Sequence, residues 1–306
     1  MSKSIPVLNG PVFGVAVDQG SGLGAALKTA RGVHAKDDDL LQFKRIVVET
    51  LSPDATTLLV DAEYGRELLP HYDPKCIKML AYEADVYRIN DADRITALPD
   101  NLTVADFPKL GAKILKFFLY FGPNDAPELN QRKFDLVQDI GRQCRAQGVT
   151  FLFEPIVYDN NVPDGASREF AAIKPELVRA TTQQFADAKF GIDILKVELP
   201  VNFQFVEGFG DPMLSRAEAQ AAIVSAAEAA GDIPLLYLSA GVTFEQFRDA
   251  LRFARSAGVN ALGFMCGRAI WSDAIGIFGA EGPAAMARWM ETTGRERLAH
   301  LKEAAT

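Results

Sequence analysis

One lysine, Lys196, lies inside an apolar stretch that reads Ile194-Leu195-Lys196-Val197. A lysine in a low-dielectric pocket loses the solvation of its ammonium form, so its pKa falls and the free amine becomes available. A free amine adds to a carbonyl carbon and goes on to an imine. The residue therefore suggests covalent attack on a carbonyl substrate.

Other charged residues also interrupt apolar runs or follow them directly. Burying such groups costs several kcal/mol unless they are paired, which a fold tolerates mostly where chemistry requires it. The alternative for any one of them is a side chain that reaches past the strand end into water. The set comprises Asp18, Asp61, Glu63, Lys116, Glu154, Lys196, Glu198 and Arg268.

Three of these residues suit the chemistry of a reactive lysine. Lys116 is a candidate for the second cation that lowers the pKa of Lys196 further. Glu154 is the candidate acid and base that protonates a carbinolamine and moves protons. Asp18 is placed to bind a hydroxyl or ammonium group of the substrate. An iminium on Lys196 would act as an electron sink that weakens a nearby carbon–carbon bond, which is class I aldolase chemistry.

The elements that must position these residues form a regular series of short apolar runs with helical segments between them, such as Asp37–Leu51 and Asn130–Gln147. Nearly continuous Val, Ile, Leu and Phe is typical of parallel strands covered on both faces. Eight such units in about 300 residues predict a single (β/α)8 TIM barrel over residues 1–306, with catalytic groups at the carboxyl ends of the strands. The predicted strands are Val12–Gln19, Thr57–Tyr64, Ile77–Tyr82, Ile114–Phe121, Thr150–Tyr158, Ile192–Val201, Leu235–Gly241 and Leu262–Trp271.

A doubly wound open sheet is the rival fold, but no GxGxxG motif follows the first strand. The glycine-rich stretch Gly20–Gly24 fits neither that motif nor a P-loop, and we interpret it as a flexible active-site loop. Asp159–Ala166 is predicted to be a longer loop after the fifth strand.

Two strand ends suit an anion. Ser239, Ala240 and Gly241 end the seventh strand with small residues, and Gly267 and Arg268 end the eighth with a guanidinium after a glycine. TIM barrels often bind phosphate at these two loops, and arginine matches phosphate oxygens with paired donors. The first segment alone fits an ordinary turn, but together the two favour phosphate.

Composition excludes several partners. The chain has 32 basic and 40 acidic residues, a net charge of −8, so no basic field is available for nucleic acid or an anionic membrane. Three histidines and three cysteines without a CxxC pair predict no catalytic metal, free thiols and a cytoplasmic protein. We expect no cofactor, and a homodimer as the default assembly.

At these residues the sequence resembles the bacterial tagatose 1,6-bisphosphate aldolase family, a class I aldolase family on a TIM barrel. The resemblance implies that Lys196 forms the Schiff base, that Glu154 transfers protons, and that Asp18 and Lys116 shape the polar site. It also implies a phosphate held by Ser239, Gly241 and Arg268, and the predicted substrate-binding set is Gln19, Ser239, Ala240, Gly241, Gly267 and Arg268. The resemblance rests on Val17–Gln19, Asp61–Gly65, Lys116–Tyr120, Phe153–Pro155, Leu195–Asn202, Phe205–Gly208, Leu238–Val242 and Cys266–Trp271.

The resemblance implies cleavage of tagatose 1,6-bisphosphate to dihydroxyacetone phosphate and glyceraldehyde 3-phosphate. One departure is Gly20, where the family usually has an arginine, with Lys28 or Arg31 as candidate substitutes. A related family cleaves 6-deoxy-6-sulfofructose 1-phosphate to dihydroxyacetone phosphate and sulfolactaldehyde, and this is the alternative substrate.

Two other classes stay open at this point. A metal-dependent barrel enzyme would need histidine or carboxylate ligands, and no histidine lies in a predicted strand. A barrel that binds a sugar phosphate without turning it over would leave the buried Lys196 without a purpose.

Overall fold

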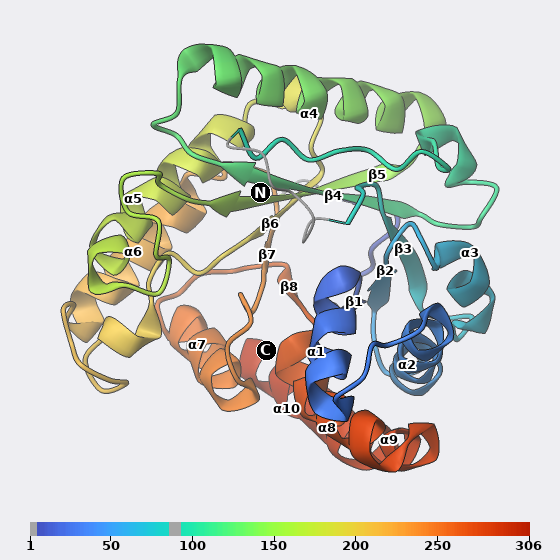
Figure 1. The fold of residues 1–306 in the computed structure, drawn as a ribbon. Coiled ribbons are helices and arrows are strands. Elements are labelled where there is room, and N and C mark those ends of the chain that lie inside the picture. The colour runs from blue at the N-terminus through green and yellow to red at the C-terminus, as the bar shows by residue number, and fades with distance from the viewer. Residues whose placement is uncertain (1–4, 86–92) are drawn as a thin grey trace.

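The computed structural model describes residues 5–85 and 93–306 and contains a closed barrel of eight parallel strands (Figure 1). Each strand pairs with the next along the chain, and β8 closes the ring by pairing with β1. The predicted (β/α)8 barrel is therefore confirmed. The strands are β1 (Val12–Val17), β2 (Thr57–Val60), β3 (Ile77–Ala81), β4 (Ile114–Phe121), β5 (Thr150–Val157), β6 (Ile194–Val197), β7 (Leu235–Tyr237) and β8 (Gly263–Cys266).

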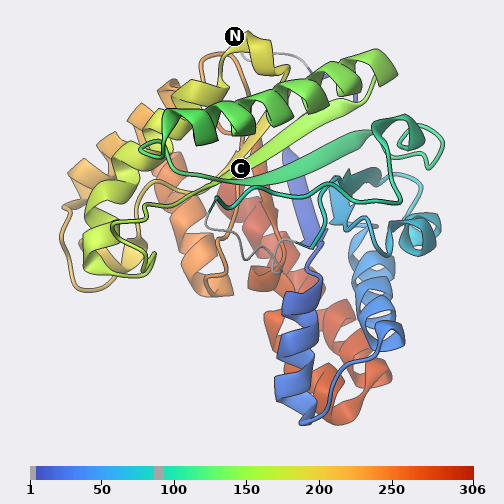
Figure 2. The same ribbon diagram turned by 45° about the horizontal axis from the view of Figure 1, so that its top comes forward.

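Helices cover the outside of the barrel, and in both views α4 runs along β4 and β5 (Figures 1 and 2). In the described part of the chain no helix combines the length and apolarity needed to cross a membrane. The α-helices are α1 (Ser21–Arg31), α2 (Asp37–Leu51), α3 (Gly65–Leu68), α4 (Pro127–Gln147), α5 (Arg168–Phe185), α6 (Arg216–Glu228), α7 (Phe244–Ser256), α8 (Arg268–Glu281), α9 (Pro283–Trp289) and α10 (Arg295–Ala305). Short helical turns are η1 (Leu69–His71), η3 (Val104–Asp106), η4 (Ala188–Phe190), η5 (Phe203–Phe205) and the π-helical η6 (Met290–Gly294).

The two main hydrophobic clusters lie on opposite faces of the strands because successive side chains point to opposite sides, and a third, small one joins Val157 of β5 to α5 and α6. The larger cluster lies between strands and helices. The smaller main cluster fills the barrel interior and closes it below the site. Its buried members are Ile5, Val12, Ala16, Leu59, Met79, Ala81, Ile114, Leu152, Ile194, Leu236 and Met265.

The first and last strands, β1 and β8, pair where the barrel closes, and α1 lies beside α8 (Figure 1). The buried indole of Trp271 donates a hydrogen bond of 2.9 Å from Nε1 to the carbonyl oxygen of Ala16. At Gly267, a Cβ atom would come within 2.2 Å of the same oxygen, so only glycine allows this approach. The start of α8 is thereby fixed against the end of β1.

The predicted strands are right in number and order, but several end too late. The eighth was predicted to reach Trp271, yet β8 ends at Cys266 and Arg268 begins α8, because Gly267 turns the chain at the barrel rim. The loop predicted at Gly20–Gly24 is wrong, since α1 begins at Ser21. The Ser21 amide donates a 2.7 Å hydrogen bond to Asp85 Oδ2, and burial of Leu23 anchors the helix.

Two smaller predictions are confirmed. The stretch Asp159–Ala166 contains no helix or strand. Cys76, Cys144 and Cys266 are buried free thiols.

Candidate active site

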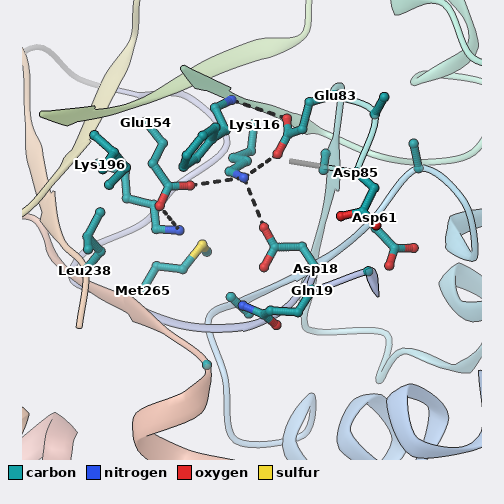
Figure 3. A pocket seen from close by; sticks show the side chains of 18 of the residues that line it. Asp18, Gln19, Asp61, Glu83, Asp85, Lys116, Glu154, Lys196, Leu238 and Met265 are labelled. Atoms are coloured by element: carbon teal, nitrogen blue, oxygen red, sulfur yellow. Dashed lines mark hydrogen bonds and ion pairs between the residues drawn. The ribbon is translucent and has the colours of Figure 1, made fainter. Parts of the chain in front are cut away.

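A cavity of about 630 Å³ opens at the carboxyl ends of the strands. Its polar side chains continue the rows of side chains that point into the barrel, because residues two apart in a strand point to the same side. Lys116 stands two positions beyond the buried Ile114, Glu154 two beyond Leu152, and Lys196 two beyond Ile194. Asp18 stands two positions beyond Ala16 in the same way. The hydrophobic cluster inside the barrel therefore forms the floor of the cavity, and these four groups meet above it (Figure 3).

Glu154 lies between the two lysines. Its Oε1 is 2.9 Å from Nζ of Lys196, and its Oε2 is 3.1 Å from Nζ of Lys116. Lys196 is only 4% exposed, and its amine points into the cavity (Figure 3). A carboxylate in hydrogen-bond contact with a buried amine at a cavity is the arrangement that nucleophilic attack with proton transfer requires.

Lys116 is the more heavily paired lysine. Its amine contacts Asp18 Oδ2 at 3.0 Å and Glu154, and it donates a short hydrogen bond to Glu83. Burial alone lowers the pKa of Lys116, but the charges of Glu154, Glu83 and Asp18 outweigh it and hold that pKa well above its usual value. Lys116 is therefore a permanent ammonium group at neutral pH.

Asp18 and Gln19 follow β1 on the opposite side of the cavity. Burial raises the pKa of Asp18, but the charges of Lys116 and Lys196 outweigh this and leave it below its usual value, so Asp18 is ionised. Gln19 lines the cavity, and its buried Oε1 accepts no hydrogen bond from the residues that the structure describes. That oxygen is available to a hydroxyl group of a bound ligand.

Glu83 and Asp85, which follow β3, were missed from the sequence although both line the cavity. Glu83 is 7% exposed and contacts Lys116. The same alternation marks Glu83, since Met79, Ala81 and Glu83 share one face, but Glu83 lies one residue beyond the predicted end of the third strand at Tyr82.

The predicted anion site lies at the loops after β7 and β8. Arg268 is exposed at the first position of α8, where the helix dipole favours anions. Ala240 and Gly241 have φ values of 49° and 81°, which turn the chain tightly after Ser239. A Cβ atom on Gly241 would lie 3.0 Å from Cζ of Arg268, so glycine lets the guanidinium pack against this turn. The structure thus brings both predicted segments to one edge of the cavity.

The remaining charged residues of the sequence set, Asp61, Glu63 and Glu198, also line the cavity but have structural partners or reach solvent. The carboxylate of Asp61 pairs with Lys44, a fully buried lysine of α2 that sequence reasoning missed and whose pKa burial lowers to about 7. Glu198 pairs with Lys174 of α5 at 3.1 Å. Glu63 is exposed. The alternative that a charged side chain merely reaches past the strand end into water is therefore right for Glu63. It is wrong for Lys116 and Lys196, which are buried.

The candidate substitutes for a cation beside Gly20 lie elsewhere. Arg31 forms an ion pair of 2.8 Å with Asp39 and covers the ring of Phe278, and neither it nor Lys28 lines the cavity. A Cβ atom on Gly20 would instead meet the carboxyl group of Asp85 at 2.8 Å. This corner of the cavity is acidic, and the predicted substitution by Lys28 or Arg31 is wrong.

Known proteins match almost the whole chain. The model of the DeoC/LacD family aldolase matches residues 13–273. The chain is 36% identical over 299 residues to a tagatose 1,6-diphosphate aldolase of Streptococcus mutans, covering 96% of this chain and 91% of that one. It is 37% identical over 287 residues to the enzyme of the same name from Staphylococcus aureus, covering 91% and 87%. A fructose-bisphosphate aldolase structure from Plasmodium falciparum shares the fold, with a TM-score of 0.71 at 13% identity over 95% of this chain and 89% of that one.

Proposed function

The chain belongs to the DeoC/LacD family of aldolases, and from that premise we propose that it cleaves tagatose 1,6-bisphosphate through a Schiff base on Lys196. The products are dihydroxyacetone phosphate and glyceraldehyde 3-phosphate. The main support for the proposal is the contact between the buried Lys196 amine and Oε1 of Glu154. Lys116 holds the same carboxylate through Oε2.

Substrate binding begins at the phosphate. Arg268 and the start of α8 provide positive charge at one edge of the cavity, and Ser239 and Gly241 lie beside them. A ketose 1-phosphate bound there directs its carbon chain across the cavity, toward Lys196. Asp18 and Gln19 then face the hydroxyl groups of the sugar.

Imine formation uses Lys196 and Glu154. Glu154 takes a proton from the ammonium group of Lys196, the neutral amine adds to carbon 2, and Glu154 returns that proton to the carbinolamine hydroxyl, which leaves as water. Lys116 holds Glu154 in place during this step through its 3.1 Å contact. The result is an iminium whose positive charge lies in a pocket rich in carboxylates.

Cleavage follows from that iminium. A carboxylate removes the proton of the hydroxyl group on carbon 4, and the electrons of the bond between carbons 3 and 4 move to the iminium nitrogen. The aldehyde leaves, the enamine takes a proton at carbon 3, and water releases dihydroxyacetone phosphate from Lys196. Glu154, which contacts the amine directly, is the carboxylate we assign to both proton transfers.

Borohydride trapping tests this function. Dihydroxyacetone phosphate and borohydride should add one reduced adduct to Lys196, identified by peptide mass, and activity should survive EDTA. Tagatose 1,6-bisphosphate and 6-deoxy-6-sulfofructose 1-phosphate are assayed side by side for release of dihydroxyacetone phosphate. The absence of both an adduct and cleavage of either sugar would disprove the proposal.

The proposal also covers the cellular compartment and the small-molecule partner. We place the reaction in the cytoplasm, which the three buried free thiols support because a reducing compartment preserves them. The small-molecule partner is a sugar phosphate.

Arg268→Ala is expected to weaken substrate binding more than chemistry, because the guanidinium contacts the phosphate and not the reacting carbons. A lost charge-assisted hydrogen bond predicts a rise in KM of about tenfold to a hundredfold. Steady-state kinetics with tagatose 1,6-bisphosphate measure it. Arg31→Ala is the matched control, since Arg31 is paired with Asp39 outside the cavity. A normal KM in Arg268→Ala would show that the phosphate binds elsewhere.

A further inference from the structure

The second anionic group of the proposed substrate has no cation to bind it inside the cavity. Among the described residues that line the cavity, the cations are Lys116, Lys196 and Arg268. Lys196 is assigned to the imine, Lys116 is held by three carboxylates, and Arg268 lies at the edge assigned to the first phosphate. An anionic group on carbon 6 therefore needs a positive side chain at the rim.

The order of the strands indicates where the far end of the sugar lies. In a closed ring of eight strands, β4 stands opposite β8. A ketose whose first phosphate binds beside Arg268, and whose carbon 2 meets Lys196 of β6, therefore extends toward β4. Beyond Lys116, the side chains of β4 that line the cavity are Phe118 and Tyr120.

Arg94 lies beside this end of β4. Its guanidinium carbon Cζ is 5.7 Å from the ring centre of Tyr120 and 4.1 Å from that of Tyr158. The ring centre of Tyr120 is 4.9 Å from that of Phe118, which in turn lies 5.3 Å from the Lys116 amine. This row of close contacts connects Arg94 to the wall of the cavity.

The segment that carries Arg94 also forms part of the cavity rim. Residues 99–101 line the cavity, and the backbone amide of Ala84 donates a 2.8 Å hydrogen bond to the carbonyl oxygen of Ala97. Arg94 is half-buried and has a φ of 47°, a left-handed conformation that costs free energy in a residue other than glycine. This backbone conformation and the two tyrosine rings together fix the direction of the guanidinium.

The positive charge of Arg94 is not balanced by a carboxylate within residues 5–85 and 93–306. Its chain neighbour Asp93 pairs instead with Arg132 at 2.9 Å, and Asp125 pairs with Lys133 at 3.2 Å. Stacking on an aromatic ring occupies the face of a guanidinium and leaves the N–H groups at its edge free to donate. Such an edge matches the oxygens of a phosphate with paired donors.

We propose that Arg94 binds the anionic group on carbon 6 of the substrate, a phosphate or a sulfonate, and thereby determines a preference for ketoses with an anion at both ends. The proposal rests on the Schiff-base function assigned above. Arg94 takes no part in imine formation or in cleavage of the carbon–carbon bond. Its contribution is confined to binding the far end of the sugar.

Steady-state kinetics with two sugars that differ only at carbon 6 test this role. Arg94→Met keeps the apolar stem over the tyrosine rings and removes the charge. The KM of this variant for tagatose 1,6-bisphosphate should rise by about tenfold to a hundredfold, because a charge-assisted hydrogen bond is lost. Its KM for tagatose 1-phosphate, which has a hydroxyl group at carbon 6, should remain that of the wild type.

Arg132→Met is the matched control, since Arg132 is an exposed arginine that pairs with the neighbouring Asp93, and it should leave both KM values unchanged. 6-Deoxy-6-sulfofructose 1-phosphate is assayed alongside, and the sugar with the larger rise in KM carries the group that Arg94 binds. Equal rises for all three sugars in Arg94→Met, or no rise for any of them, would overturn the role of Arg94. So would the same selective rise in Arg132→Met.

If Arg94→Met does not fold, chemical modification of arginine in the inactive variant Lys196→Met decides. Tagatose 1,6-bisphosphate should protect Arg94 from phenylglyoxal, as measured by peptide mass, whereas tagatose 1-phosphate should not. Equal modification of Arg94 with both sugars contradicts the proposal. A failure of the proposed function looks different, because the wild type would then cleave none of these sugars and give no borohydride adduct with dihydroxyacetone phosphate.

Discussion

Replacement of Lys196 by alanine is expected to lower kcat/KM for the ketose phosphate by at least about 10⁴-fold, the scale seen when a covalent nucleophile is removed. No other group described at the cavity floor can take its place, because Lys116 is held as an ammonium by three carboxylates. Release of dihydroxyacetone phosphate in a coupled assay measures the loss, and mass spectrometry should find no borohydride adduct.

Two controls separate chemistry from folding. Lys196→Met preserves the apolar stem of the side chain, so it should fold with a thermal midpoint near that of the wild type and be equally inactive. Lys113→Ala removes an exposed lysine at the amino end of β4, away from the cavity at the carboxyl ends of the strands, and should retain activity. Normal turnover in Lys196→Ala would mean that another lysine forms the imine.

Glu154→Gln is expected to reduce kcat by about 10²- to 10⁴-fold, the usual contribution of a positioned general acid or base. The amide keeps the shape of the carboxylate but cannot shuttle protons between carbinolamine, substrate hydroxyl and enamine. KM should change little, since the phosphate contacts are intact. Single-turnover kinetics should show that both formation of the imine and cleavage are slow.

Glu198→Gln is the matched comparison for this variant. Glu198 is also a buried carboxylate at a strand end with a lysine partner, but that partner is Lys174 of α5. Its loss should lower thermal stability and leave turnover near that of the wild type. Equal losses of kcat in Glu154→Gln and Glu198→Gln would remove Glu154 from the proton-transfer role.

The alternation and composition of the strands made the barrel predictable from the sequence. Runs such as Ile114–Phe121 are buried on both faces, and their apolar composition records that directly. Lys116 and Lys196 stood out because a charge inside such a run is rare. Strand ends were less predictable, since apolar residues continue past β8 into the buried face of α8.

The partners of these lysines were harder to foresee. Glu83 lies beyond the predicted end of its strand at Tyr82, where a carboxylate does not interrupt a predicted strand, and only the barrel brings it to Lys116. Lys44 of α2 lies three and four residues before the buried Val47 and Val48, so helical spacing places it on the covered face, but nothing local identifies its partner Asp61. Pairings between residues far apart in sequence depend on the register of neighbouring strands, which composition does not encode.

Closure of the barrel also sets the order in which the site is assembled. The hydrogen bond from Trp271 to Ala16 joins positions 255 residues apart, so it forms only after nearly the whole chain has been synthesised. Contacts of such long range are slow to form because a large loop must close first. A nascent chain that already contains Lys196 and Glu154 still lacks Arg268 and the phosphate site at that edge of the cavity. Its β1, which positions Asp18, also has no β8 to pair with. The growing polypeptide is therefore inactive on the ribosome, and the enzyme becomes active only when β8 pairs with β1.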